Sequence, residues 1–519
     1  MMPYSWFLAL ERADSQTLFR ENLERFGFLI PPASPKNPDA LPLGFVEDPN
    51  APSFGGVTEK RWVGLTCAAC HTAAIAYKKQ PSDTTFSTLI IDGGPTVANF
   101  GTFIHALAPA IVATLQDSDK YARFEQRVLG ANPSEGNATT LKQSFTRFAA
   151  EFKRYIESSE TPVPWGPGRV DAFGMIFNRV CTLALDLPQN RYAPNAPVSY
   201  PFLWNVNQQD HIQWHGEVEN INPFRLLDPI DRLGRNTGEV MGVFARIDMR
   251  PGSVPGYASS VNLDGLLTLE YEMDKLKPPK WPENILGKIN QQDNAQGKVL
   301  YDQYCLRCHV RITSSFQVVP IKWNQGLYPL KDVGTDPNST VNVHSRLSMQ
   351  TGRLQGQPVN IIGNKRFTGT ASAQELVGNA VIGSLLHLPL NHLPNSRVIA
   401  PQIKAQVASA YTPASQPDLT KIGYEARPLH GIWATAPYLH NGSVPNLYQL
   451  LVPSAYRDPQ FYVGSREYNT ENVGYRSDAA SGGELFDTHL DGNHNTGHDY
   501  GIGLHPDQRR QLIEYLKTL

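Results

Sequence analysis

The amino-acid sequence predicts a mainly α protein that is divided into two domains with long loops and insertions. Its 519 residues exceed what one ordinary hydrophobic core accommodates. Several segments carry apolar residues at helical spacing, whereas patterns that alternate as in a strand are few. The motif Cys-x-x-Cys-His occurs twice, at residues 67–71 and 305–309. Each half of the chain therefore contains one copy of this motif.

The repeated motif uses four of the five cysteines and leaves Cys181 alone, which we interpret as a packing residue. Cys-x-x-Cys-His is the attachment motif of c-type haem. Both sulfurs lie on one face of a helical turn and reach the vinyl groups of one porphyrin, while the adjacent imidazole reaches the iron. We therefore predict two covalently attached haem c groups. The predicted attachment residues are Cys67, Cys70, Cys305 and Cys308, and the proximal iron ligands are His71 and His309.

Two other uses of paired cysteines fit the sequence less well. A zinc ribbon needs four cysteines and does not require the histidine that follows each pair. A thioredoxin-like redox pair normally follows a strand in a βαβ unit and has no use for that histidine. The spacing therefore favours haem.

In chain order, the first segments with helical spacing are residues 15–26, 98–115 and 171–187. Next comes the sequence KLKPPKWPEN at residues 275–284, whose three prolines interrupt helical patterning. We place the domain boundary there. The prediction is thus two cytochrome c-like haem domains, with the catalytic haem in residues 1–276 and the electron-transfer haem in residues 284–519.

The second domain is predicted to begin and end with helices, as a cytochrome c domain does. Asp293 or Asn294 is suited to cap a helix that runs into the second motif. At the other end, Pro506 suits the first turn of a terminal helix. Its apolar stripe consists of Leu512, Ile513, Leu516 and Leu519.

The sixth iron ligand of such a domain usually comes from the loop before the terminal helix, and methionine is its commonest form. Met349 is the one methionine after the second motif, and it is far from that loop. His498 lies eight residues before Pro506, in the expected place. We therefore predict that His309 and His498 close the C-terminal iron from both sides, which suits electron transfer. The alternatives are His440 and, less favoured because either reads as a loop residue, His494 and His489.

No residue stands out as the sixth ligand of the N-terminal haem. His105 lies on a predicted helix, where a core histidine is as good an interpretation as an iron ligand. Residues 200–222 read either as a loop anchored by aromatic burial or as the distal wall of this haem with a tryptophan electron relay. The candidate catalytic residues there are Trp204, Trp214 and His215, and His211 is a further candidate ligand. An iron without a strong sixth ligand binds O2 or peroxide, so we predict that the N-terminal haem is the reaction centre.

Several longer stretches resemble a known family. They include LTCAACHTA, PWGPGRVDAFG, GRNTGEVMGVFA, TAPYLHNGSVPNL and GNHNTGHDYG. The chain resembles the di-haem cytochrome c peroxidase and MauG superfamily, and within it the sequence is most similar to the rubber oxygenases and di-haem fatty-acid dioxygenases.

The resemblance implies roles for individual residues. His71 is then the proximal ligand of the catalytic haem, and His309 and His498 ligate the electron-transfer haem. The histidine that matches His440 lies near the second haem without ligating it. Trp204 is the match for a tryptophan that relays electrons between the haems.

The predicted function is that of a di-haem dioxygenase that acts on an unsaturated apolar substrate, polyisoprene or a fatty acid, with O2 bound at the N-terminal haem. The alternatives are a peroxidase that reduces H2O2 and a non-catalytic electron carrier. A small redox protein is a further candidate partner.

The composition bears on partners and location. Nucleic acid is not expected, because 46 basic and 48 acidic residues are spread along the chain. No membrane span is expected, because no run of about 18 apolar residues occurs. Haem attachment of this type is made outside the cytoplasm, so we expect a periplasmic or secreted protein whose leader is not present in this sequence.

Overall fold

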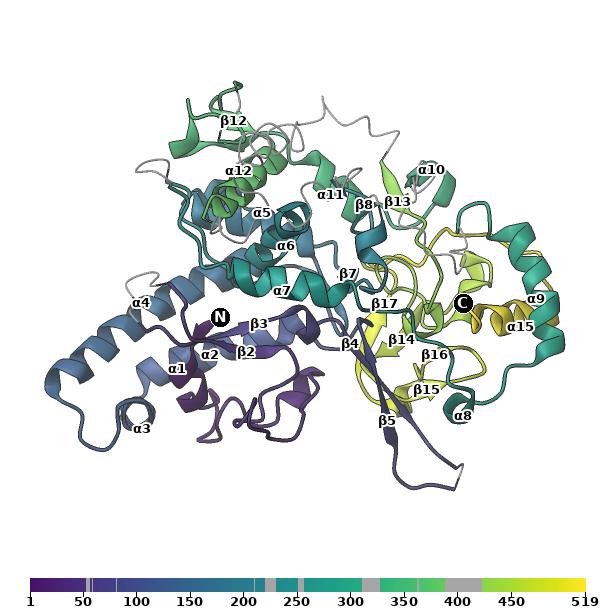
Figure 1. Cartoon of the computed structure of the whole chain (residues 1–519), viewed down its shortest axis with the longest axis horizontal. Coiled ribbons are helices and arrows are strands. Elements are labelled where there is room, and N and C mark those ends of the chain that lie inside the picture. Colours follow the sequence, from purple (N-terminus) through teal and green to yellow (C-terminus); the bar gives the residue numbers. More distant parts are fainter. Residues whose placement is uncertain are drawn as a thin grey trace.

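The structure is a computed structural model of the full chain, residues 1–519 (Figure 1). It describes residues 1–52, 57, 59–80, 82–209, 211–219, 230–250, 256–309, 327–361, 364–387 and 422–519. The α-helices of this part of the chain are α1 (Tyr4–Ala9), α2 (Phe100–Gln116), α3 (Ser118–Leu129), α4 (Glu135–Ser159), α5 (Ala172–Phe177), α6 (Ile230–Val243), α7 (Leu263–Met273), α8 (Glu283–Leu286), α9 (Gln291–Tyr304), α10 (Leu330–Val333), α11 (Asn338–Ser345), α12 (Ala373–Leu385), α14 (Leu447–Leu450) and α15 (Pro506–Leu516).

The strands of the same residues pair into one three-stranded sheet, β1-β3-β2, and seven two-stranded sheets. They are β1 (Met2–Pro3), β2 (Phe45–Asp48), β3 (Trp62–Leu65), β4 (Thr72–Tyr77), β5 (Ser87–Asp92), β6 (Arg169–Val170), β7 (Val198–Ser199), β8 (His211–Ile212), β9 (Val218–Glu219), β10 (Leu327–Pro329), β11 (Met349–Gln350), β12 (Thr370–Ala371), β13 (Gly423–Glu425), β14 (Gln460–Val463), β15 (Tyr468–Asn469), β16 (Gly474–Tyr475) and β17 (Glu484–Asp487).

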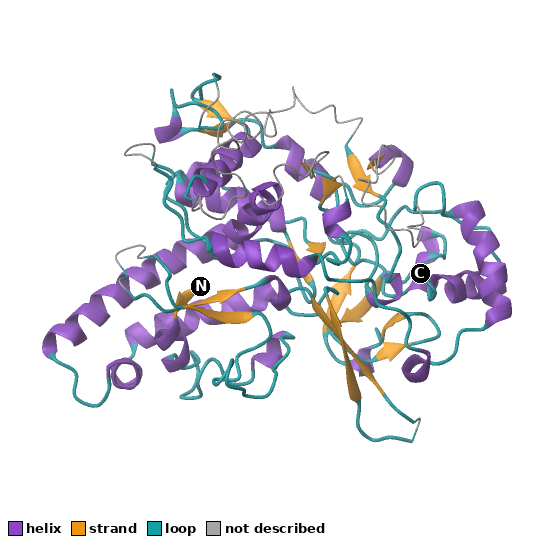
Figure 2. Ribbon diagram, in the orientation of Figure 1, coloured by secondary structure: helices purple, strands orange, loops and turns teal. Residues whose placement is uncertain are grey.

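The prediction of a mainly α protein is wrong, because the fold is mixed α and β. Helices account for 40% and strands for 15% of the described residues, and Figure 2 shows small sheets scattered between the helices. These strands are two to six residues long, too short to produce a readable alternation. Even the six residues of β4, TAAIAY, do not alternate polar with apolar side chains.

The predicted N-terminal helices have different outcomes. The helix at 98–115 is confirmed as α2, whose cap Asn99 accepts a hydrogen bond from the Thr102 amide at 3.0 Å. The helix at 171–187 is confirmed as α5 followed by a π-helix over Asn178–Ala184. A helix at 15–26 is wrong, since only a 3₁₀ turn over Leu23–Phe26 forms there.

Both cysteine motifs fold into the same tight turn. The amide of His71 donates to the carbonyl of Cys67 at 2.9 Å, and the amide of His309 donates to the carbonyl of Cys305 at 2.8 Å. The first turn connects β3 to the β4–β5 hairpin, whereas the second follows the end of α9. Each motif therefore presents its two sulfurs and its histidine from one turn of chain.

The helices α9 and α15 pack closely against each other at one end of the molecule (Figure 1). The N-cap of α9 is Asn290, a few residues before the predicted cap. Apolar residues of α9 do not all face the core, because Tyr301 is 1% exposed but Val299 is 63% exposed. A Cβ atom on Gly297 would lie 1.9 Å from the carbonyl oxygen of Gln511, so glycine allows this contact.

Several apolar cores hold the molecule together. One lies within the first 175 residues and includes Phe103 and Phe148. A second contains Trp204 and residues of α15 such as Leu512, and a third contains Cys181 and residues of α12. These two cores contain residues from both sides of residues 276–284, and the division into 1–276 and 284–519 stays a prediction.

Candidate haem-binding sites

A cavity of about 590 Å³ adjoins the first motif, and we name it the N-terminal cavity. Cys67, Cys70 and His71 line it. The Nδ1 atom of His71 donates a hydrogen bond to the carbonyl oxygen of Pro201 at 2.7 Å. This contact places the proton on Nδ1 and leaves Nε2 as a free ligand, which is how proteins orient a metal-binding imidazole.

A smaller cavity of about 190 Å³ adjoins the second motif, and we name it the C-terminal cavity. It is lined by Cys305, Cys308 and His309. The Nδ1 atom of His309 donates to the carbonyl oxygen of Arg427 at 2.8 Å, which repeats the arrangement around the first motif. Both imidazoles are thus held in the same tautomer by a backbone carbonyl.

The C-terminal cavity contains a second imidazole opposite the first. The ring centres of His309 and His498 lie 6.1 Å apart. Metal–nitrogen bonds to histidine are about 2 Å long, so an iron held between two imidazoles separates the ring centres by roughly 6 Å. Burial lowers the pKa of His498 to about 3 and also lowers that of His309, which keeps both rings neutral and able to bind a metal.

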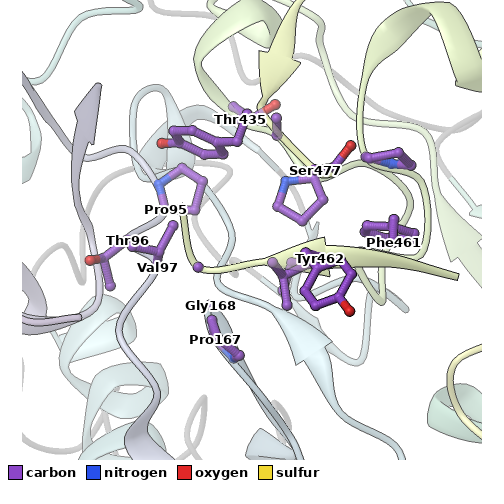
Figure 3. Close-up of a pocket in the computed structure, with 16 residues that line it drawn as sticks. Pro95, Thr96, Val97, Pro167, Gly168, Thr435, Phe461, Tyr462 and Ser477 are labelled. Carbon is purple, nitrogen blue, oxygen red and sulfur yellow. The ribbon is translucent and has the colours of Figure 1, made fainter. Parts of the chain in front are cut away.

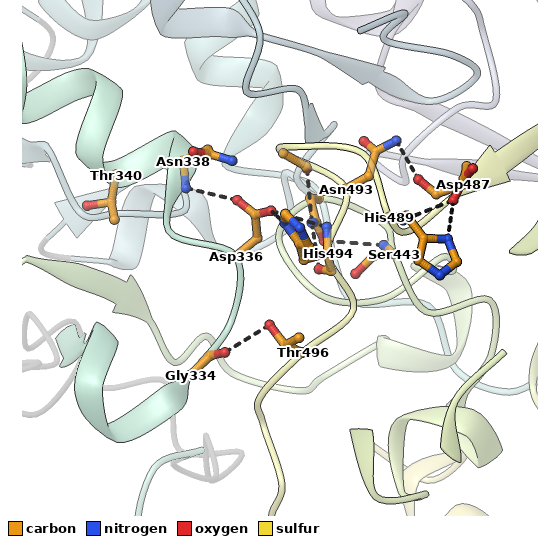
Figure 4. Close-up of polar contacts among 12 residues, drawn as sticks. Gly334, Asp336, Asn338, Thr340, Ser443, Asp487, His489, Asn493, His494 and Thr496 are labelled. Carbon is orange, nitrogen blue, oxygen red and sulfur yellow. Dashed lines mark hydrogen bonds and ion pairs between the residues drawn. The ribbon is translucent and has the colours of Figure 1, made fainter. Parts of the chain in front are cut away.

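The other candidate histidines of this region have different partners (Figure 4). The Nδ1 atom of His494 lies 2.6 Å from a carboxylate oxygen of Asp336, and His489 contacts Asp487 in the same way at 2.7 Å. His440 lines the cavity but stacks on the ring of Tyr424, with 3.9 Å between the ring centres. Of the candidates in the described chain, His498 is the one whose ring is in contact with that of His309.

The candidate ligands for the first iron lie away from the N-terminal cavity. His105 is exposed on α2, and its Nδ1 donates to the carbonyl of Gly101 at 2.8 Å. His211 is in β8. His215 is buried, with its ring centre 4.7 Å from that of Phe173. Among the described residues that line this cavity, His71 is the one histidine.

The N-terminal cavity has a largely apolar lining. The helices α6 and α7 and the turn after α6 contribute Val240, Val243, Phe244, Leu266, Leu269 and Met273. Met175 of α5 also lines it. Phe244 was missed by the sequence analysis, although it lies in the quoted stretch GRNTGEVMGVFA, because one phenylalanine among 22 carries no sign of its position.

The cysteine thiols do not have the properties of a redox pair or a zinc site. Burial raises the pKa of Cys67 to about 11 and those of Cys70 and Cys305 to about 12. A catalytic redox cysteine instead has a lowered pKa. In the part of the chain that the structure describes, no three His, Cys, Asp or Glu side chains are grouped to hold a metal ion. Neutral thiols beside apolar cavities fit thioether links to a porphyrin.

Four of the described residues line both cavities and form the wall between them. They are Ser199, Tyr200, Phe202 and Arg427. Trp204 lies behind this shared wall and stacks on Phe202, with ring centres 4.9 Å apart, while its Nε1 donates to the carbonyl of His430. Trp214 lines the C-terminal cavity. Each predicted tryptophan thus contacts one residue of the shared wall, Trp204 through Phe202 and Trp214 through Arg427, whereas His215 lines neither cavity.

A third cavity, of about 20 Å³, has room for a water molecule but not for a larger ligand (Figure 3). Pro95 and Pro167 approach it from the N-terminal half, and Phe461 and Tyr462 approach it from the C-terminal half. It is lined by no cysteine or histidine among the described residues, and we assign it no function.

The two motifs are typical of one class, the cytochrome c-like haem proteins. Residues 423–462 match the family described as RoxA-like, cytochrome c-like, which supports a haem family and suggests a haem-binding oxidoreductase. Uncharacterized protein y4iJ of Sinorhizobium fredii is 30% identical over an alignment of 558 residues. The alignment covers 100% of this chain and 89% of y4iJ. The chain belongs to the same family as y4iJ.

A second protein of that organism, Uncharacterized protein y4iM, is 26% identical over 344 residues, which cover 61% of this chain and 63% of y4iM. Within the described residues, no helix combines the length and apolar character needed to cross a membrane.

Proposed function

We propose that the protein is a di-haem c-type dioxygenase of the periplasm or the extracellular space that oxidises an unsaturated apolar substrate, such as polyisoprene or a fatty acid, with O2. The resemblance to rubber oxygenases and di-haem fatty-acid dioxygenases agrees with this proposal. Each haem, when bound, supplies an iron that exchanges electrons and, where its sixth position is free, takes up a small oxidant.

One observation carries the proposal, namely the difference between the two cavities. The C-terminal cavity offers a second imidazole 6.1 Å from that of His309, so its iron would be closed. The N-terminal cavity, in its described part, offers His71 alone among histidines and an apolar surface on α6 and α7. Such a surface excludes water and accepts a hydrocarbon chain.

The residues of the chain would have separate roles. The carbonyl of Pro201 holds the His71 ring through Nδ1 and keeps Nε2 directed away from it. Phe244 and the leucines of α7 would bind the apolar part of the substrate. Phe202 in the shared wall stacks on Trp204, which lines neither cavity, and the two rings would form an aromatic path beside both cavities.

The first test uses the purified protein with its haems attached. Oxygen uptake with an unsaturated fatty acid or polyisoprene, without any reductant, is the expected result. A saturated fatty acid of the same length is the control, because it offers no double bond to oxidise. Absence of uptake with every unsaturated substrate would argue against a dioxygenase.

The second test examines coordination at the N-terminal haem. The reduced protein should bind CO at one haem only. Met175 and Met273 line the N-terminal cavity, and a thioether from either would close its iron and favour the electron carrier. Replacing each by leucine separately would then release a ligand and change the ferric spectrum, whereas the dioxygenase proposal predicts no such change.

A peroxidase is the second candidate, and Glu239 favours it. This carboxyl group lines the N-terminal cavity and accepts a hydrogen bond from Gln213. Burial raises its pKa to about 7, so its carboxyl oxygen can hold or release a proton near neutral pH. Reduction of H2O2 to water consumes protons. Peroxide consumption that requires a reduced donor and falls in Glu239→Gln would support this alternative over the dioxygenase.

A further inference from the structure

Arg427 is the charged member of the shared wall. Its side chain is 5% exposed and lines both cavities. The guanidinium packs 4.7 Å from the ring centre of Trp214 and 5.5 Å from that of Phe202. Its own backbone carbonyl accepts the hydrogen bond from His309. The residue therefore touches the C-terminal haem site through its backbone and both sites through its side chain.

Three arginines among the described residues line the N-terminal cavity, and they differ in their partners. Arg235 forms an ion pair with Glu270 at 2.9 Å, and Arg246 forms one with Glu151 at 2.9 Å. Arg427 forms no ion pair or side-chain hydrogen bond with the described residues, and its Nε and Nη1 atoms are buried without a partner. Among the described arginines of this cavity, Arg427 is therefore the one without an ion-pair partner, and two of its donors are unsatisfied.

An unpaired buried guanidinium is unfavourable. Burial lowers the pKa of Arg427 to about 10, and the charge of Glu425 opposes this shift, so the side chain stays protonated at neutral pH. A buried charge without a partner typically costs several kcal/mol. The planar, forked arrangement of its donors matches the two oxygens of a carboxylate.

We propose that Arg427 is a carboxylate-binding site shared by the two cavities, and that it holds a carboxylate of the group bound there. Two sources have this chemistry. One is a propionate of either haem, and the other is the carboxylate head of a fatty acid lying in the N-terminal cavity. The inference deepens the proposed function and rests on it, because both sources assume that these cavities hold haem and an acyl substrate.

The two sources predict different effects of removing the charge. If a propionate is bound, Arg427→Gln removes a cation beside a haem and favours the ferric state. The reduction equilibrium of that haem should then fall at least tenfold, which corresponds to 59 mV for one electron. If a fatty acid is bound, a saturated medium-chain fatty acid should bind at least tenfold more weakly, while the alcohol of the same length binds as before. A fall in potential without this loss of acid binding identifies a propionate.

The experiment compares variants of the holoprotein by spectroelectrochemistry and by titration with that acid and that alcohol. Arg346→Gln is the matched control, since Arg346 is also buried, also packs on two aromatic rings and lines neither cavity in the described structure. The substitution leaves the backbone carbonyl of Arg427 in place, so His309 should keep its hydrogen bond. Optical spectra of each variant report whether the His309 and His498 ligands are retained.

Either predicted effect, absent from the Arg346 control, would support the proposal and identify the source. Unchanged potentials together with unchanged discrimination between acid and alcohol would overturn it. Arg427→Lys keeps the positive charge but loses the paired donors of the guanidinium. This second variant is used if Arg427→Gln does not fold. The lysine variant should show a smaller change in the same direction, and wild-type behaviour in both measurements would overturn the proposal. Neither readout requires turnover, so a lack of oxygen uptake would contradict the proposed function alone.

Discussion

The N-terminal and C-terminal cavities contain the same five-residue motif in the same turn, yet their opposite sides differ. In both, the histidine of the motif donates through Nδ1 to a backbone carbonyl, at 2.7 Å for His71 and 2.8 Å for His309. The C-terminal cavity adds His498, whereas the N-terminal cavity adds aliphatic side chains of α6 and α7 and the ring of Phe244 in the turn after α6. The same motif is therefore compatible with two different iron sites, one closed and one open. The residues opposite the histidine of the motif would decide which of the two forms.

The two regions are also held together differently. The C-terminal region relies on α9 packing against α15 without a Cβ atom at Gly297. The N-terminal region includes a buried carboxylate, Glu11, which pairs with Arg123 at 2.7 Å and Arg127 at 2.8 Å. One region thus depends on close backbone packing and the other on a charge network.

The largest expected effect is the loss of a whole cofactor. Replacing both Cys67 and Cys70 by serine should reduce the covalent haem content by one per chain, and replacing Cys305 and Cys308 should do the same. Pyridine haemochrome analysis measures this content. Cys181→Ser is the control and should retain both groups, because Cys181 is buried away from either motif. Loss of both haems from one double substitution would contradict two independent sites.

The next effect would make the closed cavity resemble the open one. His498→Ala should free the sixth position of the C-terminal iron, so that its affinity for CO rises at least about tenfold. Titration of the reduced protein with CO measures the change. His494→Ala is the control, since that ring is bound to Asp336 and should leave CO binding unchanged. If CO affinity rose in His440→Ala and not in His498→Ala, His440 and not His498 would be the sixth ligand of the C-terminal iron.

A third effect concerns the packing of the C-terminal region. Gly297→Val should destabilise the protein by about 3 kcal/mol or more, because the new side chain meets the Gln511 backbone. Thermal unfolding followed by circular dichroism measures the loss. Gly136→Ala in α4 meets no atom within 4 Å and should be neutral or slightly stabilising. Equal melting temperatures for both variants would mean that α9 and α15 pack less closely than described.

The smallest effect concerns the charge network of the N-terminal region. Hydrogen bonds from Arg123 lead the causes that lower the pKa of Glu11 to about 2, from an ordinary value of 4.5. Because the folded-state pKa is lowered, this stability is present above pH 4.5 and is lost as the pH falls towards 2. Glu11→Gln should therefore lower stability by roughly 2 kcal/mol at pH 7 and by much less at pH 3. Denaturant unfolding at both pH values measures the difference.

Glu47→Gln is the control for that substitution. Glu47 pairs with Arg61 at the surface, where an ion pair contributes less than about 1 kcal/mol. A loss of the same size in both variants would show that burial of Glu11 adds nothing.

The predicted fold was partly right for identifiable reasons. The helices α2 and α15 were predictable because their apolar residues recur along a long enough stretch. The many small sheets were not, since strands of two or three residues leave no periodic pattern and depend on a partner strand elsewhere in the chain. Val299 shows a related limit, because it is an apolar residue of α9 that is 63% exposed, and its residue type gives no sign of this.

The sequence by itself determined the chemistry of the proximal side. The sulfurs and imidazole of each motif lie within five consecutive residues, so local backbone geometry is enough to bring them together. The tertiary structure decided most of what faces them. His498 was already a candidate because of its place before the terminal helix, but Phe244 and Arg427 were not, and each lies more than a hundred residues from the cysteines whose cavity it lines. Only the packed fold brings such distant residues to the cavities, and it does so differently at each.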